Sequence, residues 1–110
     1  MTNVLLIDDD RVHTERIARV LNQRGLITSR VASIREAIRR LQCRPASFDL
    51  VVLAIADRSH PWLEILHQLQ QAAWQAGMTT SPFFLCISRI GVGAEFQLQV
   101  ERMGARLVLE

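Results

Sequence analysis

The sequence has no lysine and no tyrosine, and its 110 residues include only two cysteines and three prolines. The cysteines, Cys43 and Cys86, lack the spacing of a metal-binding motif, so reduced thiols of a cytoplasmic protein are expected. No apolar run approaches the roughly 20 residues that span a membrane, and no signal-peptide pattern is present. These absences favour a single cytoplasmic domain over residues 1–110, either complete or the N-terminal part of a longer protein.

The absence of lysine means that all thirteen basic residues are arginines, against eleven acidic residues, for a net charge of +2. Arginine recurs through the first half of the chain, with positions 11, 16, 19, 24, 35, 39, 40 and 44 among its places. Nucleic-acid binding would usually bring a denser basic patch with aromatic side chains for stacking, and the chain has only two Trp and four Phe. We therefore interpret the arginines as solvated helix faces and expect no direct binding of nucleic acid.

Short apolar runs alternate with amphipathic stretches along the whole chain. The runs predict strands at residues 3–7, 26–31, 50–55, 83–87 and 106–109. The amphipathic stretches predict helices at residues 11–24, from 34 onward, at 62–76 and at 94–103, although residues 96–100 also alternate like a strand. This alternation predicts a flavodoxin-like three-layer α/β sandwich around a five-stranded parallel sheet in the order 2-1-3-4-5.

Local signals set the bounds of the first two helices. Asp9 or Asp10 can cap the first helix, and Gly25 stops it. Ser33 and Glu36 form a capping box at the start of the second. The spacing of Ile17, Val20 and Leu21, with Val12 as a further member, predicts the buried face of the first helix.

In the predicted strand order, the carboxyl ends of the first, third and fourth strands meet at one crevice, where ligands usually bind in such sheets. These ends carry Asp8 with Asp9, then Ala54, then Ser88. Adjacent carboxylates suggest a site for a hard cation such as Mg²⁺, although helix capping alone would explain one of them.

The chain resembles the receiver domain of two-component response regulators, the CheY-like family, along its whole length. LLIDDDRVHTERIARVLNQRG is similar to the family's opening, and the resemblance implies that Asp8 and Asp9 are its Mg²⁺-binding pair. FDLVVLA is similar to its third strand, where a phosphoacceptor Asp lies five residues after another Asp; counted from Asp49, that position is Ala54. Glu64, ten residues after Ala54, matches a common glutamate and supports the register.

The same resemblance places Ser88 at the family's phosphoryl-binding hydroxyl and Val108 at the aromatic residue of its switch. The family's phosphate-contacting lysine has no counterpart, because the chain has no lysine. A chain without the nucleophilic carboxylate cannot form an acyl phosphate at this position. The resemblance therefore implies a degenerate pseudo-receiver that is not an enzyme, needs no cofactor, retains at most weak Mg²⁺ binding, and acts by binding proteins.

Two alternatives stay open at this point. Asp57 is the nearby carboxylate that could replace Ala54 as phosphoacceptor, although a turn residue is the simpler interpretation. Alternatively, the emptied pocket beside Ala54 could bind a small ligand or a cation. His13, His60 and His67 share no ligand spacing, and we expect them to be solvated or partly buried.

Receivers usually end in a fifth helix that packs beside the first, whereas this sequence stops after the predicted fifth strand. One sheet face would then be covered by the first helix alone, which is rare for a parallel sheet. Three explanations stay open: the chain is a fragment of a longer protein, a second copy covers that face, or a different protein covers it. We expect an interface that includes Leu98, Val100, Met103 and Leu107.

Overall fold

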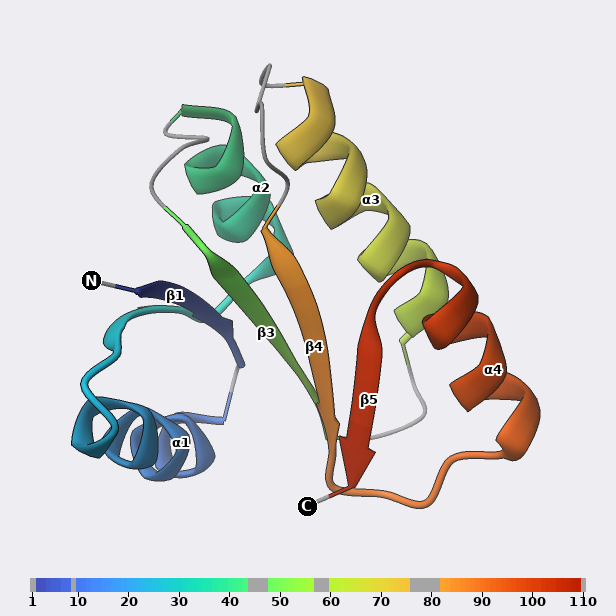
Figure 1. The fold of residues 1–110 in the computed structure, drawn as a ribbon, viewed down its shortest axis with the longest axis horizontal. Coiled ribbons are helices and arrows are strands. Elements are labelled where there is room, and N and C mark those ends of the chain that lie inside the picture. Colours follow the sequence, from blue (N-terminus) through green and yellow to red (C-terminus); the bar gives the residue numbers. More distant parts are fainter. Residues whose placement is uncertain (1, 9, 44–47, 57–59, 76–81, 110) are drawn as a thin grey trace.

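The computed structural model describes residues 2–8, 10–43, 48–56, 60–75 and 82–109 (Figure 1). Its strands are β1 (Asn3–Ile7), β2 (Ile27–Val31), β3 (Leu50–Ile55), β4 (Phe83–Ser88) and β5 (Arg106–Leu109). Its helices are α1 (Arg11–Gln23), α2 (Ile34–Cys43), α3 (Trp62–Gln75) and α4 (Ala94–Arg102). Each predicted element is present at nearly the predicted bounds, and residues 94–102 are helical.

The five strands form one parallel sheet in the order β2-β1-β3-β4-β5, which confirms the flavodoxin-like prediction. β1 and β3 are almost wholly buried, as expected for central strands that have cover on both faces. The edge strand β5 is exposed at three of its four residues. Within the described ranges no helix is long and apolar enough to cross a membrane.

The sheet separates two apolar clusters of unequal size. The larger cluster unites side chains of the sheet with α2, α3 and α4, and includes Leu53, Leu66 and Val100. The smaller cluster lies under α1 and centres on Val4, Leu6, Ala18 and Val52. The two outer layers are therefore unequal, with three helices on one face of the sheet and α1 on the other (Figure 1).

The first helix is capped as predicted, and two residues of its predicted buried face, Ile17 and Leu21, pack against the smaller cluster. Asp10 is its N-cap and accepts a hydrogen bond from the backbone N–H of His13, while Gly25, at φ 81°, follows its C-terminus. His13, Thr14 and Ala18 are buried, whereas Val12 and Val20 are 70% and 51% exposed. The prediction that Val12 and Val20 face the core was wrong, because α1 packs mainly against β1 and β2.

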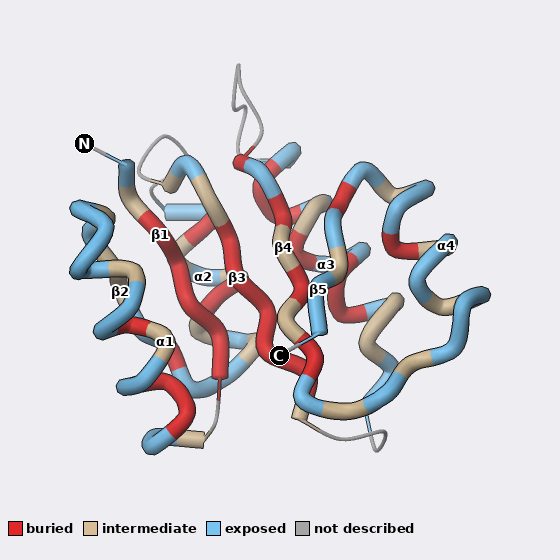
Figure 2. The backbone as a smooth tube through the Cα atoms, turned by 60° about the horizontal axis from the view of Figure 1, so that its bottom comes forward, coloured by how far each residue is buried: buried red, intermediate tan, exposed pale blue. Residues whose placement is uncertain are grey.

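The half of the α1-side face that belongs to β4 and β5 has no helix over it in the described parts of the chain (Figure 2). Phe83 and Val108 are 47% and 44% exposed there. Leu85 and Ile87, which alternate with buried residues along β4, are half-buried. Apart from Arg106, which pairs with Leu85, this strip is apolar surface of the kind that marks interaction sites in soluble proteins.

The four residues predicted for an interface have different surroundings from this strip. Val100 is 1% exposed in the larger core cluster, so the prediction that it contributes to an interface was wrong. Met103 and Leu107 are half-buried against the same cluster. Leu98 is 45% exposed and stays available for contact. In the helix, Val100 faces the core and Leu98 faces solvent. The alternating apolar pattern of the sequence does not distinguish these two residues.

The two thiols are free and differ in burial. Cys43 is exposed at the end of α2, while Cys86 lies in β4 within the core. Burial raises the pKa of the Cys86 thiol to about 12, because desolvation disfavours the thiolate. Cys86 is therefore an inert part of the core.

Candidate functional site

The sheet register brings the predicted crevice residues to neighbouring positions. Ile7 pairs with Leu53, so Asp8 and Ala54 are the next residues along adjacent strands. Ser88 pairs with Ile55, one residue beyond Ala54. Asp8, Ala54 and Ser88 are all buried, with exposed fractions of 6%, 4% and 1%. Two further predicted site residues, Asp9 and Asp57, lie outside the described part of the structure.

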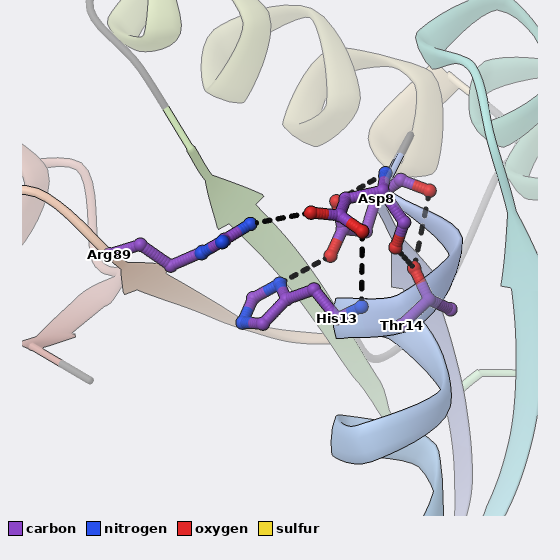
Figure 3. Close-up of polar contacts among 5 residues, drawn as sticks. Asp8, His13, Thr14 and Arg89 are labelled. Atoms are coloured by element: carbon purple, nitrogen blue, oxygen red, sulfur yellow. Dashed lines mark hydrogen bonds and ion pairs between the residues drawn. The ribbon is translucent and has the colours of Figure 1, made fainter.

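Asp8 forms a buried pair with His13 (Figure 3). Nδ1 of the imidazole lies 2.6 Å from Asp8 Oδ2, and both side chains are at most 3% exposed. Because an ionised carboxylate only accepts hydrogen bonds, the Nδ1 proton is carried by the ring and donated to Asp8. Thr14 adds a second buried contact by donating its hydroxyl hydrogen toward backbone oxygens of Asp8 and Asp10.

The sequence interpretation missed this pair, since it expected His13 to be solvated or partly buried. A signal was available in the capping pattern. With Asp10 as N-cap, His13 is the third residue of the helix, and helical side chains lean back toward the N-terminus. That direction carries the imidazole toward the end of β1, where Asp8 lies.

Asp10, the other described aspartate of the DDD run, pairs with an arginine from the other side of the crevice (Figure 3). Nη1 of Arg89, the residue directly after β4, lies 2.8 Å from Asp10 Oδ2. The hydrogen bond from Arg89 lowers the pKa of Asp10 below 3.8, and the backbone N–H of His13 lowers it further. This contact joins the start of α1 to the β4–α4 loop across 79 positions of the chain.

The Arg89 contact makes a prediction about Asp10. Because the folded-state pKa is depressed, the stabilisation exists above the unfolded-state value and is lost as pH falls through the folded-state pKa. Replacing Arg89→Gln should therefore raise the pKa of Asp10, as followed by NMR titration of its carboxyl carbon between about pH 2 and 6. Arg40→Gln, which breaks the exposed Arg40–Glu36 pair on α2, is the control and should leave Asp10 unchanged. An unchanged Asp10 titration in Arg89→Gln would show that the contact does not form in solution.

The two remaining family positions are turned away from a phosphoryl-binding arrangement. The hydroxyl of Ser88 donates to the carbonyl oxygen of Ile90 at 2.6 Å and accepts from the Ile90 N–H at 3.2 Å. Val108 lies on β5 opposite Ile87 and has no ring to change rotamer. The Ser88 hydroxyl thus stabilises the backbone of the loop that follows β4.

Magnesium, the ion that receiver folds imply, does not fit the described donors. Mg²⁺ needs free oxygens in a near-octahedral shell, usually from one or two carboxylates. Both oxygens of Asp8 already accept hydrogen bonds, from His13 and from the Asp10 N–H, and Ala54 offers none. Within the described ranges, no three His, Cys, Asp or Glu side chains gather as a metal-binding group.

A pocket of about 260 Å³ lies beside Ala54, with Asp8, Ser33, His60 and Trp62 among its lining residues. A wider apolar groove of about 720 Å³ adjoins it, and His60 and Trp62 line both hollows. The rings of His60 and Trp62 lie 5.1 Å apart between their centroids. The described site therefore has room for a ligand but offers it few polar groups to bind.

Comparison with solved structures finds this fold repeatedly in bacterial signalling proteins. A two-component response regulator from Clostridium difficile matches with a TM-score of 0.78 and 16% identity, over 100% of this chain and 84% of that one. The fold is that of response-regulator receiver domains. The chemotaxis protein CheY4 of Vibrio cholerae matches with a TM-score of 0.77 and 19% identity, over 100% and 87% of the two chains.

The non-phosphorylated HemR receiver domain of Leptospira biflexa matches with a TM-score of 0.76 and 23% identity, over 100% of this chain and 82% of that one. No family model and no curated protein matches the sequence. At these identities the likeness shows the fold alone, so the function of this receiver-like chain rests on its own site residues.

Proposed function

We propose that this chain is a degenerate receiver that works in bacterial signalling without phosphorylation, as a cytoplasmic protein-interaction module and not as an enzyme. The observation that carries the proposal is Ala54, a methyl group at the carboxyl end of β3 where phosphoryl transfer needs a nucleophile. The absence of any lysine supports it, because no ammonium group can neutralise a phosphoryl group.

Phosphorylation can be tested directly. The chain is incubated with acetyl phosphate and Mg²⁺ and its intact mass is measured, with a phosphorylatable receiver treated in parallel. We expect no adduct of one phosphoryl group, about 80 Da, because the described crevice holds no free nucleophilic carboxylate.

A stoichiometric adduct would overturn the proposal. If the adduct disappears in Asp57→Asn, Asp57 is a replacement phosphoacceptor. If it persists there, another residue accepts the phosphoryl group, and the chain is still a phosphorylated receiver.

The apolar strip of β4 and β5, formed by Phe83, Leu85, Ile87 and Val108, supports a second copy of the chain as the partner. A two-fold dimer brings the same patch of both copies together, so an apolar strip can be complementary to itself. Parallel sheets are normally covered on both faces, and such pairing would complete the cover.

Dimerisation makes a prediction for Val108, which is 44% exposed within the strip. Val108→Glu places a charge of the same sign on both copies and should raise the dimer dissociation constant about 100-fold or more. Sedimentation velocity over a concentration series measures this change. Ile27→Glu is the matched control, since Ile27 is 46% exposed on the opposite edge strand, and it should leave association unchanged. A wild-type chain that is monomeric at high concentration would rule out the second copy as partner.

A second candidate function is favoured by the pocket beside Ala54. Its volume of about 260 Å³ and its mainly apolar lining, which also includes Ser33 and His60, suit a small molecule. Ala54→Leu would fill part of that space. A compound that raises the melting temperature of the wild type but not of Ala54→Leu would establish ligand sensing in place of dimerisation as the main role.

A further inference from the structure

The two described carboxylates at the crevice, Asp8 and Asp10, accept hydrogen bonds from within the protein (Figure 3). Asp8 Oδ1 accepts from the backbone N–H of Asp10 at 3.0 Å, and Asp8 Oδ2 accepts from His13 at 2.6 Å. Asp10 Oδ1 accepts from the backbone N–H of His13 at 3.2 Å, and Asp10 Oδ2 accepts from Arg89 at 2.8 Å. Every carboxylate oxygen of these two residues therefore has a partner.

The burial of the two pairs differs and sets their roles. Asp8 and His13 are shielded from water, so the loss of the imidazole would leave the buried Asp8 carboxylate without the hydrogen bond to its Oδ2 atom. The Asp10 and Arg89 side chains are 37% and 39% exposed, so their pair is screened by solvent and contributes little to stability. His13 is thus the group on which the buried carboxylate depends.

We propose that His13 takes the place of a metal ion in this crevice. Its imidazole N–H gives Asp8 the electropositive partner that a divalent cation would otherwise provide, and Arg89 does the same for Asp10 from the β4–α4 loop. The crevice is consequently held in one arrangement by side chains of the chain itself, without a metal. This inference deepens the proposed phosphorylation-independent function, but it concerns the pairing alone and can fail separately.

The dependence of Asp8 on His13 is tested by a double-mutant cycle. His13→Met keeps an extended side chain of similar bulk and removes the donor. We expect it to lower the melting temperature by about 10 °C or more, because it strands a buried carboxylate. In the Asp8→Asn background the same change should cost much less, since no charge is left unpaired. His67→Met, at an exposed position of α3, is the matched control and should have little effect.

The exclusion of metal is tested on the wild-type chain, which avoids any failure of the variants to fold. Backbone amide NMR spectra are recorded during titration with Mg²⁺ to about 10 mM, well above the range of ordinary divalent sites, and with Mn²⁺ as a paramagnetic probe. We expect no saturable shifts and no selective broadening at residues 8, 10, 13, 14 and 89. NaCl of matched ionic strength serves as the reference.

Two results would overturn the inference. Saturable, site-selective perturbation by Mg²⁺ or Mn²⁺ would show that a metal competes with His13 for the carboxylates. Equal and additive effects of His13→Met in the wild-type and Asp8→Asn backgrounds would show that the buried pair does not form. Neither result bears on whether acetyl phosphate modifies the chain, so the proposed function would be judged separately by mass measurement.

Discussion

Restoring an aspartate at position 54 is expected to destabilise this protein. Ala54 is 4% exposed and next to Asp8 in the sheet register, and the imidazole of His13 is already committed to Asp8. A carboxylate added there is buried beside a like charge, and the chain has no lysine to pair with it. We expect Ala54→Asp to lower the free energy of unfolding by roughly 3 kcal/mol, as measured by urea denaturation at pH 7.

Ala54→Asn is the control for this experiment, because it has the same shape without the charge. The adjoining pocket of about 260 Å³ leaves room for either side chain, so steric overlap should not dominate. We expect the asparagine variant to lose only about 1 kcal/mol, the typical cost of an imperfectly satisfied polar group. An aspartate variant as stable as the wild type, or one stabilised specifically by Mg²⁺, would mean that the crevice keeps a working receiver site.

The second large effect separates core from surface on α4. Val100 is 1% exposed and packs in the larger apolar cluster, whereas Leu98, two residues earlier, is 45% exposed. Val100→Ala removes two buried methyl groups and leaves a cavity, so it should cost about 2 kcal/mol of unfolding free energy. Leu98→Ala should cost at most about 0.5 kcal/mol, as is usual for surface substitutions.

The same two variants distinguish folding from association. Sedimentation velocity should show that Val100→Ala leaves the intrinsic affinity between folded copies unchanged, because Val100 does not reach the surface. A Val100→Ala variant with a weaker dimer and unaltered stability would show that Val100 belongs to the interface, as the apolar pattern of the sequence predicts.

The fold could be predicted from local patterns to a high degree. Strand and helix periods, the Asp10 cap, Gly25 and the capping box that begins at Ser33 all act over a few residues, and the structure follows them. The hydrogen bond from the Glu36 N–H to the Ser33 hydroxyl, at 3.2 Å, is one such case. Right-handed crossovers then leave few topologies for five parallel strands, so the strand order could also be predicted.

The site could be predicted only in part. The convergence of Asp8, Ala54 and Ser88 follows from strand ends in a doubly wound sheet, and the register confirms it. The hydrogen-bond partners of the acidic residues at this crevice could not be predicted from the strand ends. The sequence predicts a solvated or partly buried His13, and no local pattern points to Arg89, because the contact between Arg89 and Asp10 spans 79 positions.

By itself the sequence determined the alternating α/β fold, the methyl group at position 54 and the lack of any lysine, because these depend on residue identity and local period. Only the tertiary structure decided that His13 is buried against Asp8 and that Val100 is core. Among the described residues, it also decided that the strip on β4 and β5 has no helix over it. Those outcomes depend on the direction and packing of side chains from distant elements, which no local pattern encodes.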